Sequence, residues 1–390
     1  MVTTVSPLRP RVAHLIHADA AGGGPQILLD HLAHTRDRFT LSAIYGGNGR
    51  VAAACEVGGI PHHKLPLDRP WKWLAGLPML VHLLVRDKPD LLVLHGQWGA
   101  TIGGVAGRLA GVKTIVYLTV WPAFYGATDA YRAARNDCCE RLACRLAHRV
   151  VTLSAGNYYQ YLIRGMVRPG CFVQLSHGID LARVPTTDDT AAVRRSLGGG
   201  PAACHVISVG RLVAQKRVDW LLQSWKRVQA AEPSARLWIV GSGDEETSLK
   251  RLTHDLGIES TCSFLGNRPN GITYLAAADI VAMTSLFEAP GCVPLEALAC
   301  GRPIVASRVD GIMDSVEDGT TGFLVPPGNS ERFADRLLEL IRNPALRQRM
   351  GQASRDAVQQ FAMPDVMARF VTVMSQWHAE RNRRPESLAP

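Results

Sequence analysis

The chain has 390 residues, a length that suits two domains rather than one hydrophobic core. Apolar residues make up 47% and charged residues 20% of it, a composition typical of ordinary soluble proteins. No apolar run reaches the roughly 20 residues of a membrane span, and residues 1–10 lack the apolar segment of a secretory signal, so we expect a cytoplasmic protein.

The net charge of +9 is concentrated in the first half of the chain. Residues 1–179 hold 19 Lys and Arg against 10 Asp and Glu, whereas residues 180–390 hold 24 of each kind. Such an asymmetry suggests an acidic partner such as nucleic acid, an anionic membrane surface or a phosphate-bearing substrate. A solvated basic face without any partner explains it equally well.

Strand and helix patterns alternate through the first half. Residues 12–17 predict the first strand, a loop with three glycines follows, and Pro25 suits the first turn of a helix. This loop lacks the GxGxxG spacing, so a dinucleotide site is only weakly indicated. Further strands are expected at residues 39–45, 62–65, 90–95, 113–118, 150–153 and 172–176, and further helices at 50–58, 71–86, 100–110, 130–148 and 155–166.

Residues 176–180 and the polar segment 185–190 look like a hinge, after which the alternation starts again. Strands are expected at residues 204–209, 235–240, 261–265, 279–284, 303–307 and 322–325, helices at 218–231, 244–256 and 271–277, and a helical tail from 330 to about 381. The order predicts an α/β protein with two Rossmann-like domains that face each other across a cleft. Ligand sites are then expected at the carboxyl ends of the parallel strands.

Two carboxylates, Glu288 and Glu296, flank the turn at residues 289–291, which leads from an apolar strand into a short helix. Such a turn directs backbone N–H groups and the positive end of a helix into one crevice, which favours an anion. Two acids beside an anion site are consistent with a ligand that also offers neutral hydroxyls, as a sugar nucleotide does. The simpler interpretation is that Glu296 only favours the first turn of a helix.

Cations and glycines follow two other strands of the same domain. Arg211 can hold phosphate oxygens through its planar guanidinium, and Lys216 adds a point charge five residues later. Gly241 and Gly243 end a strand and open a helix, so they can approach a phosphate or a base, although a single Gly-x-Gly is weak evidence. A glycine-capped loop with surface bases is the alternative.

The strand ends of the first domain supply candidates for the other wall of a cleft. His17 and His95 each end a strand, and with Trp121 we expect them on the side of the acceptor. Gly23 and Gly24 would approach a diphosphate from that wall. For each histidine, an ordinary core or edge position is the alternative.

A catalytic metal is not expected, because neither an Asp-x-Asp motif nor a His/Cys ligand cluster is visible in the sequence. Nine cysteines without CxxC spacing argue against a disulfide framework. The close group Cys138, Cys139 and Cys144 is interpreted as helix packing rather than as a metal site.

The segment 71–80 of the basic half is amphipathic. It combines Trp71 and Trp73 with leucines and Lys72, which is the composition of a helix lying in a membrane interface. An ordinary domain helix with two tryptophans at its edge is the alternative.

Several of these motifs together resemble the GT-B glycosyltransferases of family 4. The resemblance covers residues 204–330 in order and is looser in the first half, at Gly23-Gly24, residues 90–95 and residues 177–180. It is carried by residues 209–212 with Lys216, 239–243, 264–266, Glu288 with Glu296 and Ala297, 301–307 and 319–326.

The resemblance implies a retaining, metal-independent transfer of a hexosyl group from a nucleotide-diphospho-sugar to a saccharide or lipid-linked acceptor, in the biosynthesis of cell-surface polysaccharide. It also implies three parts of the chain. Residues 1–178 would bind the acceptor, residues 179–362 would bind the nucleotide sugar, and residues 363–390 would form a helix that packs back on the first domain, with a tail. No cofactor and no nucleic acid are expected, and a peripheral position on the inner face of a membrane fits the basic half.

The resemblance also assigns residue roles. Arg211 and Lys216 would hold the diphosphate, with Glu288, Lys216 and Arg211 as the catalytic set. Glu296 would hold the ribose hydroxyls, and Glu288 would touch the donor hexose. The remaining donor contacts would come from Gly23, Gly24, Gly241 and Gly243 and from the backbone N–H groups of Gly291, Cys292 and Val293.

Two departures from the family pattern keep alternatives open. Residues 289–291 read Ala-Pro-Gly where relatives commonly have Gly-Phe-Gly, and Val120 stands near a position where many carry histidine. A nucleotide-sugar epimerase of the same fold and a catalytically impaired nucleotide-sugar-binding protein are the alternatives. The donor base, the hexose and the acceptor are not encoded in any short motif.

Overall fold

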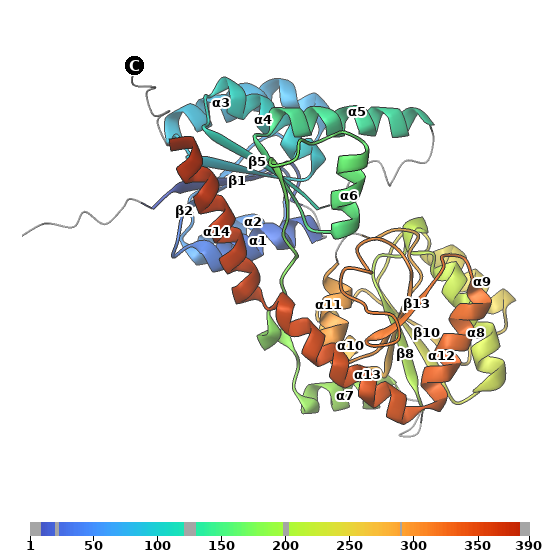
Figure 1. Cartoon of the computed structure of the whole chain (residues 1–390). Helices are drawn as coiled ribbons and strands as arrows, with labels where there is room; N and C mark the ends of the chain where they lie inside the picture. The colour runs from blue at the N-terminus through green and yellow to red at the C-terminus, as the bar shows by residue number, and fades with distance from the viewer. Residues whose placement is uncertain (1–8, 20–22, 121–129, 198–202, 289–290, 383–390) are drawn as a thin grey trace, which may run out of the picture. The chain divides into compact units, whose positions relative to one another are not determined.

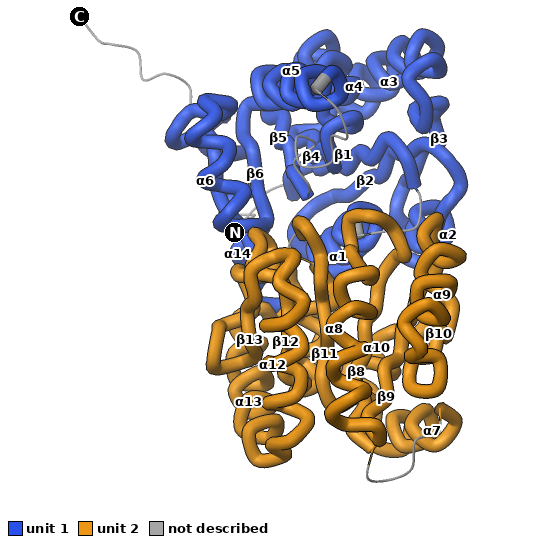
Figure 2. The backbone as a smooth tube through the Cα atoms, turned by 90° about the vertical axis from the view of Figure 1, so that its right-hand side faces the viewer, with its two compact units in different colours: residues 1–176, 364–390 blue, residues 177–363 orange. Residues whose placement is uncertain are grey.

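The computed structural model describes residues 9–19, 23–120, 130–197, 203–288 and 291–382. The chain divides into two compact units, one of residues 1–176 with 364–390 and one of residues 177–363 (Figure 2). The divisions fall between residues 176 and 177 and between 363 and 364, next to the boundaries expected at 178 and 362.

The first unit contains a seven-stranded sheet in the order β3-β2-β1-β4-β5-β6-β7, in which all neighbouring strands are parallel (Figure 1). The central strands are continuous apolar runs because the sheet is covered on both faces. The strands are β1 (Arg11–Ile16), β2 (Thr40–Tyr45), β3 (His62–Lys64), β4 (Leu91–His95), β5 (Thr114–Thr119), β6 (Arg149–Thr152) and β7 (Phe172–Gln174).

Helices cover both faces of this sheet (Figure 1). Along β1, Ala13 and Leu15 join the core under α3, α4 and α5, whereas Val12 and Ile16 join the core under α1, α2 and α14, since side chains alternate along a strand. The helices are α1 (Gly23–Thr35), α2 (Val51–Gly58), the 3₁₀ turn η1 (Pro70–Lys72), α3 (Trp73–Asp87), α4 (Gln97–Leu109), α5 (Ala130–Leu146), α6 (Ala155–Ile163) and α14 (Met363–Asn382).

The last helix, α14, belongs to the core of the first unit, as expected for a C-terminal helix that returns to the first domain. Phe370, Met374 and Trp377 are buried in the same cluster as the apolar residues of α1. Polar contacts add to this packing, because the Lys113 amine donates to Asn382 (2.9 Å). The fold of the first unit is therefore completed by residues from the far end of the chain.

The second unit contains a six-stranded parallel sheet in the order β10-β9-β8-β11-β12-β13. Its strands are β8 (His205–Val209), β9 (Arg236–Val240), β10 (Cys262–Gly266), β11 (Ile280–Met283), β12 (Ile304–Ser307) and β13 (Gly322–Val325). Two parallel α/β sheets, one in each unit, confirm the predicted fold class.

Helices of the second unit also form two layers. One core cluster joins α8, α9 and α12 to the sheet, and the other joins α10, α11 and the turn η5 to the opposite face. The bounds are the 3₁₀ turn η3 (Leu181–Arg183), α7 (Thr187–Leu197), the 3₁₀ turn η4 (Ala214–Lys216), α8 (Val218–Ala231), α9 (Glu246–Asp255), α10 (Gly271–Ala277), α11 (Cys292–Ala299), α12 (Ser330–Arg342), α13 (Pro344–Ala357) and the 3₁₀ turn η5 (Val358–Phe361).

The segment 185–190, expected as part of a hinge, is instead largely helical, because α7 begins at Thr187. The Thr186 hydroxyl accepts from the Asp189 backbone N–H (3.3 Å) and donates to the Asp189 carboxylate (2.7 Å). The hydroxyl thus satisfies one of the backbone donors at the start of the helix, and the carboxylate fixes the hydroxyl in place. The Thr-x-x-Asp spacing was the sequence signal for this helix, and the prediction overlooked it.

The segment 71–80, expected to be amphipathic, exposes apolar side chains. Leu80 is buried, whereas Trp71 and Leu74 are 69% and 90% exposed. In the described part of the chain, no helix is long and apolar enough to cross a membrane.

Candidate functional site

The clearest candidate site lies at the carboxyl ends of β8, β9 and β11 in the second unit. In the sheet, β8 lies between β9, which follows it in the chain, and β11. Where the connections after two adjacent strands run in opposite directions, their loops separate and leave a crevice between them. A pocket lies there, lined among others by Gly210, Arg211, Lys216, Thr284 and Ser285.

Lys216 and Glu288 meet at this crevice. The Lys216 amine donates to both carboxylate oxygens of Glu288, at 2.8 and 2.7 Å, and the two side chains are only 17% and 11% exposed. Both oxygens share one ammonium, so the carboxylate is held in a fixed orientation. The structure thus joins two residues that the sequence predicted for the same site, 72 positions apart.

Hydrogen bonds fasten the two loops that carry this pair. The Gln215 side-chain amide donates to the Phe287 backbone carbonyl (2.9 Å). The Gln215 backbone carbonyl accepts from the Leu286 N–H, also at 2.9 Å. The Thr284 hydroxyl donates to the Lys216 carbonyl (3.1 Å). Neither Gln215 nor Thr284 was singled out from the sequence, although Gln215 directly precedes a predicted site residue.

Arg211 also lines the pocket but is exposed. Within the described ranges its guanidinium has no ion pair, whereas Lys216 is engaged by Glu288. A planar guanidinium at a strand end can bind phosphate oxygens in a bidentate manner. Arg211 is therefore the cation that is ready for an anionic ligand.

Gly241 and Gly243 allow two strand-end loops to touch. A Cβ atom at Gly241, whose φ is +134°, would lie 1.8 Å from the Gly210 carbonyl oxygen, and one at Gly243 would lie 2.3 Å from that of Leu212. The Leu212 N–H donates to the Ser242 carbonyl (2.9 Å) across the same contact. In this structure the two glycines thus shape the loop that presents Arg211, a role that the sequence did not indicate.

The helix α11 begins four residues after Glu288, the partner of Lys216. Gly291 precedes it with extended backbone, and no side chain caps its first N–H groups in the described residues. Uncapped N–H groups at the positive end of a helix favour an anion. Cys292, in the first turn, has its thiol 3.6 Å from His177 Nε2. Residues 289 and 290 of the predicted turn lie outside the described part of the chain.

Glu296 lies on α11 with its side chain 13% exposed. Burial raises the pKa of its carboxyl, and Arg183, whose guanidinium lies 3.8 Å away, opposes this shift. At this distance the ion pair between Arg183 and Glu296 is weak, so the Glu296 carboxylate can still accept hydrogen bonds from hydroxyl groups. Arg183 lies between the two segments that were interpreted as a hinge, and no motif indicated its contact with Glu296.

In the first unit, His17 follows β1 and is half-buried, and α1, which includes Gly23 and Gly24, begins six residues later. Burial lowers the pKa of His17, and the charge of Asp68 opposes the shift. Its Nδ1 atom is buried without a hydrogen-bond partner among the described residues. Trp121 lies outside those residues, so its expected place on the acceptor side stays a prediction.

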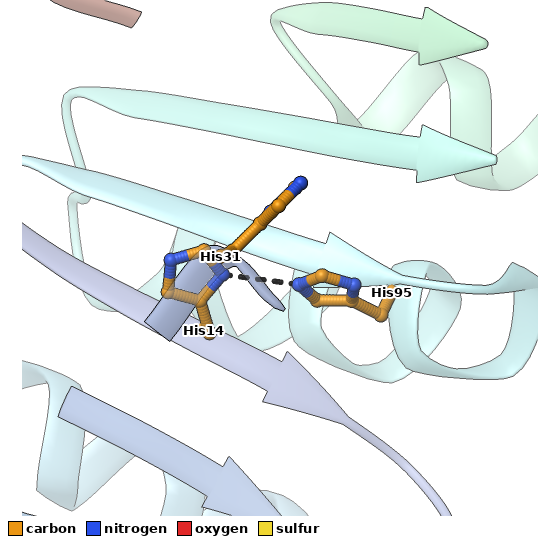
Figure 3. Close-up of side chains that lie close together, drawn as sticks. All are labelled: His14, His31 and His95. Carbon is orange, nitrogen blue, oxygen red and sulfur yellow. Dashed lines mark hydrogen bonds between the residues drawn. The ribbon is translucent and has the colours of Figure 1, made fainter. Parts of the chain in front are cut away.

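His95 occupies a different environment from the one expected. It is 1% exposed, and its Nε2 atom lies 3.0 Å from Nδ1 of the buried His14, toward which it points in Figure 3. His31 completes the group from α1, and its ring packs against Phe370 with centroids 4.1 Å apart. This burial argues against direct contact between His95 and an acceptor.

The group His14, His31 and His95 brings one nitrogen of each ring within 4.8 Å of the others. Imidazoles are zinc ligands, yet no carboxylate joins this group in the described ranges, and all three residues are buried. A divalent ion would be buried there without balancing charge, which is unfavourable. We therefore interpret the group as a hydrogen-bonded part of the core. Cys138, Cys139 and Cys144 differ in exposure, from exposed to buried, as expected for helix packing.

Comparisons with known proteins show which proteins the chain is similar to. Residues 202–357 match the family described as "Glycosyl transferases group 1", and residues 23–169 match the "Glycosyl transferase 4-like domain". The lipopolysaccharide core biosynthesis glycosyltransferase LpsE of Rhizobium meliloti is 33% identical over 318 residues, which cover 79% of this chain and 83% of LpsE.

Other relatives match over shorter stretches. The N-acetyl-alpha-D-glucosaminyl L-malate synthase of Bacillus anthracis is 29% identical over 209 residues, which cover 53% of this chain and 55% of that protein. The chain thus spans little more than half the length of this relative. Among solved structures, Anabaena HepE in complex with UDP-glucose is 24% identical, with a TM-score of 0.81 over 94% of this chain and 99% of HepE. That likeness shows a shared fold.

Proposed function

Because the chain belongs to the GT-B glycosyltransferases of family 4, we propose that it transfers a hexosyl group from a nucleotide-diphospho-sugar to a saccharide or lipid-linked acceptor in glycan biosynthesis. The observation that carries this proposal is the pocket lined by Arg211 and Lys216, with Lys216 bound to Glu288, four residues before the start of α11. It combines two cations and helix N–H groups with a carboxylate, which matches a diphosphate attached to a sugar.

The donor would lie with its diphosphate between Arg211 and the first N–H groups of α11. Arg211 is exposed and unpaired among the described residues, so its charge is available before the donor binds. Lys216, held by Glu288, would be shared between that carboxylate and a phosphate oxygen. Glu296 would accept hydrogen bonds from the ribose hydroxyls, for which its largely buried carboxylate is suited.

In the proposed reaction, the acceptor hydroxyl oxygen forms a bond to the anomeric carbon while the bond from that carbon to the diphosphate oxygen breaks. The electron pair of the broken bond stays on the departing diphosphate, which also takes the acceptor proton. Arg211, Lys216 and the helix N–H groups stabilise the developing negative charge because they are already oriented toward it. Glu288 stabilises the positive charge that develops on the sugar ring.

Retention of anomeric configuration and independence from metal ions are parts of this proposal. Departure of the diphosphate and attack of the acceptor on the same face of the sugar give retention, and the leaving phosphate then serves as the base. Two cations and a helix end offer the charge stabilisation that a metal would otherwise supply. Proton NMR of the first product settles the configuration, and activity in excess EDTA tests the metal.

The proposal is tested by incubation with UDP-, GDP- and ADP-sugars and a panel of saccharide and lipid-linked acceptors, with products identified by mass spectrometry. Lys216→Met and Glu288→Gln are each expected to lower kcat/KM by about 10²–10³-fold. Lys250→Met is the matched control, since Lys250 forms an exposed pair with Glu246 on α9. Wild-type activity in both site variants would refute the residue roles.

The same experiment separates the alternatives. An epimerase would change the sugar nucleotide when no acceptor is present. A binding protein would be stabilised by a sugar nucleotide in a thermal shift assay but would not turn it over with any acceptor. Either result would replace the transferase proposal.

A peripheral position on a cytoplasmic membrane face is a further part of the proposal. Its support is the exposure of Trp71 and Leu74 beside Lys72 at the start of α3. An apolar surface with flanking cations is typical of helices that bind at a lipid interface. Sedimentation with anionic vesicles should be reduced in Trp71→Ser/Leu74→Ser, and unchanged sedimentation would argue against this part.

A further inference from the structure

A second pocket, which the proposed reaction does not use, lies in the first unit. Its volume is about 400 Å³. We name it the arginine pocket, because its lining includes Arg108, Arg145, His148, Arg149, Arg168 and Arg381. These residues come from α4, α5, β6, α14 and the segments after α5 and α6. The folding of the first unit, rather than a sequence motif, therefore brings their charges together.

The arginine pocket lies at the opposite edge of the sheet from His17. Arg149 is the first residue of β6, and Arg108 and Arg145 lie in the last turns of α4 and α5. In a parallel α/β sheet, strand starts and helix ends share one edge, and the strand ends lie at the other. A ligand in this pocket therefore does not meet groups at the strand ends.

Few groups of the protein balance the charges of the pocket. Arg149 forms an ion pair with Glu380 (2.9 Å), and Arg108 donates to the Leu146 carbonyl (2.8 Å). Arg145, Arg168 and Arg381 have no ion pair in the part of the chain that the structure describes. Close guanidinium groups repel one another, so their gathering around a hollow favours an anionic ligand.

Two donors among the lining residues point to a ligand as well, and one of them is buried. The Nε atom of Arg149 is buried without a hydrogen-bond partner among the described residues. The Ile115 backbone N–H donates to Nδ1 of His148 (3.0 Å), so a neutral His148 carries its proton on Nε2. Burial and the charges of Arg108, Arg381 and Arg149 lower the pKa of His148 to about 4, which keeps the ring neutral at pH 7.

Helix ends alone do not account for the arginines. Cations stabilise the negative end of a helix, and Arg108 and Arg145 stand at such ends. Arg381 likewise lies in the last turn of α14. Arg168, however, follows α6 by five residues, and Arg149 is the first residue of a strand. Their convergence with Arg108, Arg145 and Arg381 on one pocket needs another explanation.

We infer that the arginine pocket binds a phosphate-ester anion that carries at least two negative charges, at a place separate from the proposed donor site. Guanidinium groups suit this class because their planar forks match phosphate oxygens. The anion belongs either to a lipid headgroup, which would fix the first unit to a membrane surface, or to a soluble phosphate. The inference does not depend on the proposed transfer reaction.

Calorimetric titration of the full chain with inorganic pyrophosphate tests the inference. Two binding events are expected for the wild type, one in each site. Arg145→Gln/Arg168→Gln should weaken one event at least tenfold, whereas Arg211→Gln should weaken the other. Arg36→Gln/Arg38→Gln is the matched control, since these two arginines are also exposed in the first unit. Arg145 and Arg168 are exposed, so the double variant is expected to fold, which circular dichroism checks.

Flotation with phosphatidylcholine vesicles, with and without phosphatidic acid, distinguishes the two sources. Reduced binding of the double variant to phosphatidic acid vesicles, with competition by pyrophosphate, identifies a lipid headgroup. Weaker pyrophosphate binding with unchanged vesicle binding identifies a soluble phosphate. If the double variant matches the wild type in both measurements, the inference is overturned, whatever the transfer activity is.

Discussion

The Lys216 ammonium lies 2.7 and 2.8 Å from the two carboxylate oxygens of Glu288, and both side chains are largely buried. The cation proposed for the diphosphate is thus held by the carboxylate proposed for the hexose. This pair holds two opposite charges in place at a strand-end crevice. It also links the stability of the second unit to its proposed chemistry.

A double-mutant cycle on this pair should reveal strong coupling. Lys216→Met leaves a poorly solvated carboxylate and is expected to lower the free energy of unfolding by about 1–3 kcal/mol. Lys216→Met/Glu288→Gln should cost about 1 kcal/mol less than the sum of the single variants. Urea unfolding followed by circular dichroism measures these differences.

The pair Lys250–Glu246, whose side chains are 53% and 29% exposed, is the control for that cycle. Its coupling should stay within about 0.5 kcal/mol, because exposed helix pairs are screened by water. Equal coupling in both pairs would show that burial does not strengthen the Lys216–Glu288 contact.

Glu296 should determine how well ribose hydroxyls are recognised. In Glu296→Gln the side chain keeps its shape but loses its charge, so we expect the affinity for a nucleoside diphosphate to fall about tenfold. The preference for this ligand over its 2′- and 3′-deoxy forms should shrink at the same time. Competition binding with the three ligands measures both effects, and undiminished preference would place the ribose elsewhere.

The raised pKa of Glu296 adds a pH dependence to that test. Because burial raises this pKa, the carboxylate takes up a proton at a higher pH than an exposed glutamate does. Affinity should therefore decline as the pH falls toward the raised pKa, and Glu296→Gln should be less sensitive over the same range.

Gly243→Ala should disturb the loop that carries Arg211. A methyl group at this position would lie 2.3 Å from the Leu212 carbonyl oxygen, so the two loops must separate. We expect a loss of about 1–3 kcal/mol in stability and weaker nucleotide binding. Gly271→Ala is the control, because its methyl group would meet Val209 at an ordinary 3.6 Å. Similar thermal midpoints for the two variants would contradict this loop contact.

Acid should destabilise both units through buried histidines. Burial lowers the pKa of His14 to about 3 and that of His177 to about 4, whereas each is near 6.5 in the unfolded chain. Below pH 6.5 the unfolded chain therefore binds more protons than the folded one, and stability is lost as the pH falls toward 4. Each residue is expected to contribute about 1.4 kcal/mol per pH unit.

Thermal midpoints between pH 7 and 4.5 measure this loss. His14→Gln and His177→Gln should each show a shallower decline than the wild type, since one titrating group is removed. His254→Gln is the control, because the exposed His254 pairs with Glu259, which raises its pKa. A decline equally steep in all three variants would show that these buried histidines do not cause it.

Local patterns in the sequence determined the strands and the loops that follow them. An apolar run such as residues 280–283 predicts a buried strand, and the glycines and charges behind it predict a strand-end loop, because both signals lie within a few adjacent residues. For this reason Arg211, Lys216, Glu288 and Glu296 could be chosen as site residues without a structure. The signal for the start of α7, which the prediction missed, was equally local, since Thr186 and Asp189 form hydrogen bonds with each other at the N-terminus of this helix.

Tertiary structure decided which of these side chains meet. No local period relates Lys216 to Glu288, and their contact depends on β11 lying next to β8 in the sheet. The same holds for His14 and His95, which meet because β4 lies next to β1, so that a histidine expected at an acceptor surface is part of the core. Arg381 reaches the arginine pocket because α14 packs on the first unit. Strand order and side-chain packing arise from the whole chain at once, and a linear motif does not contain them.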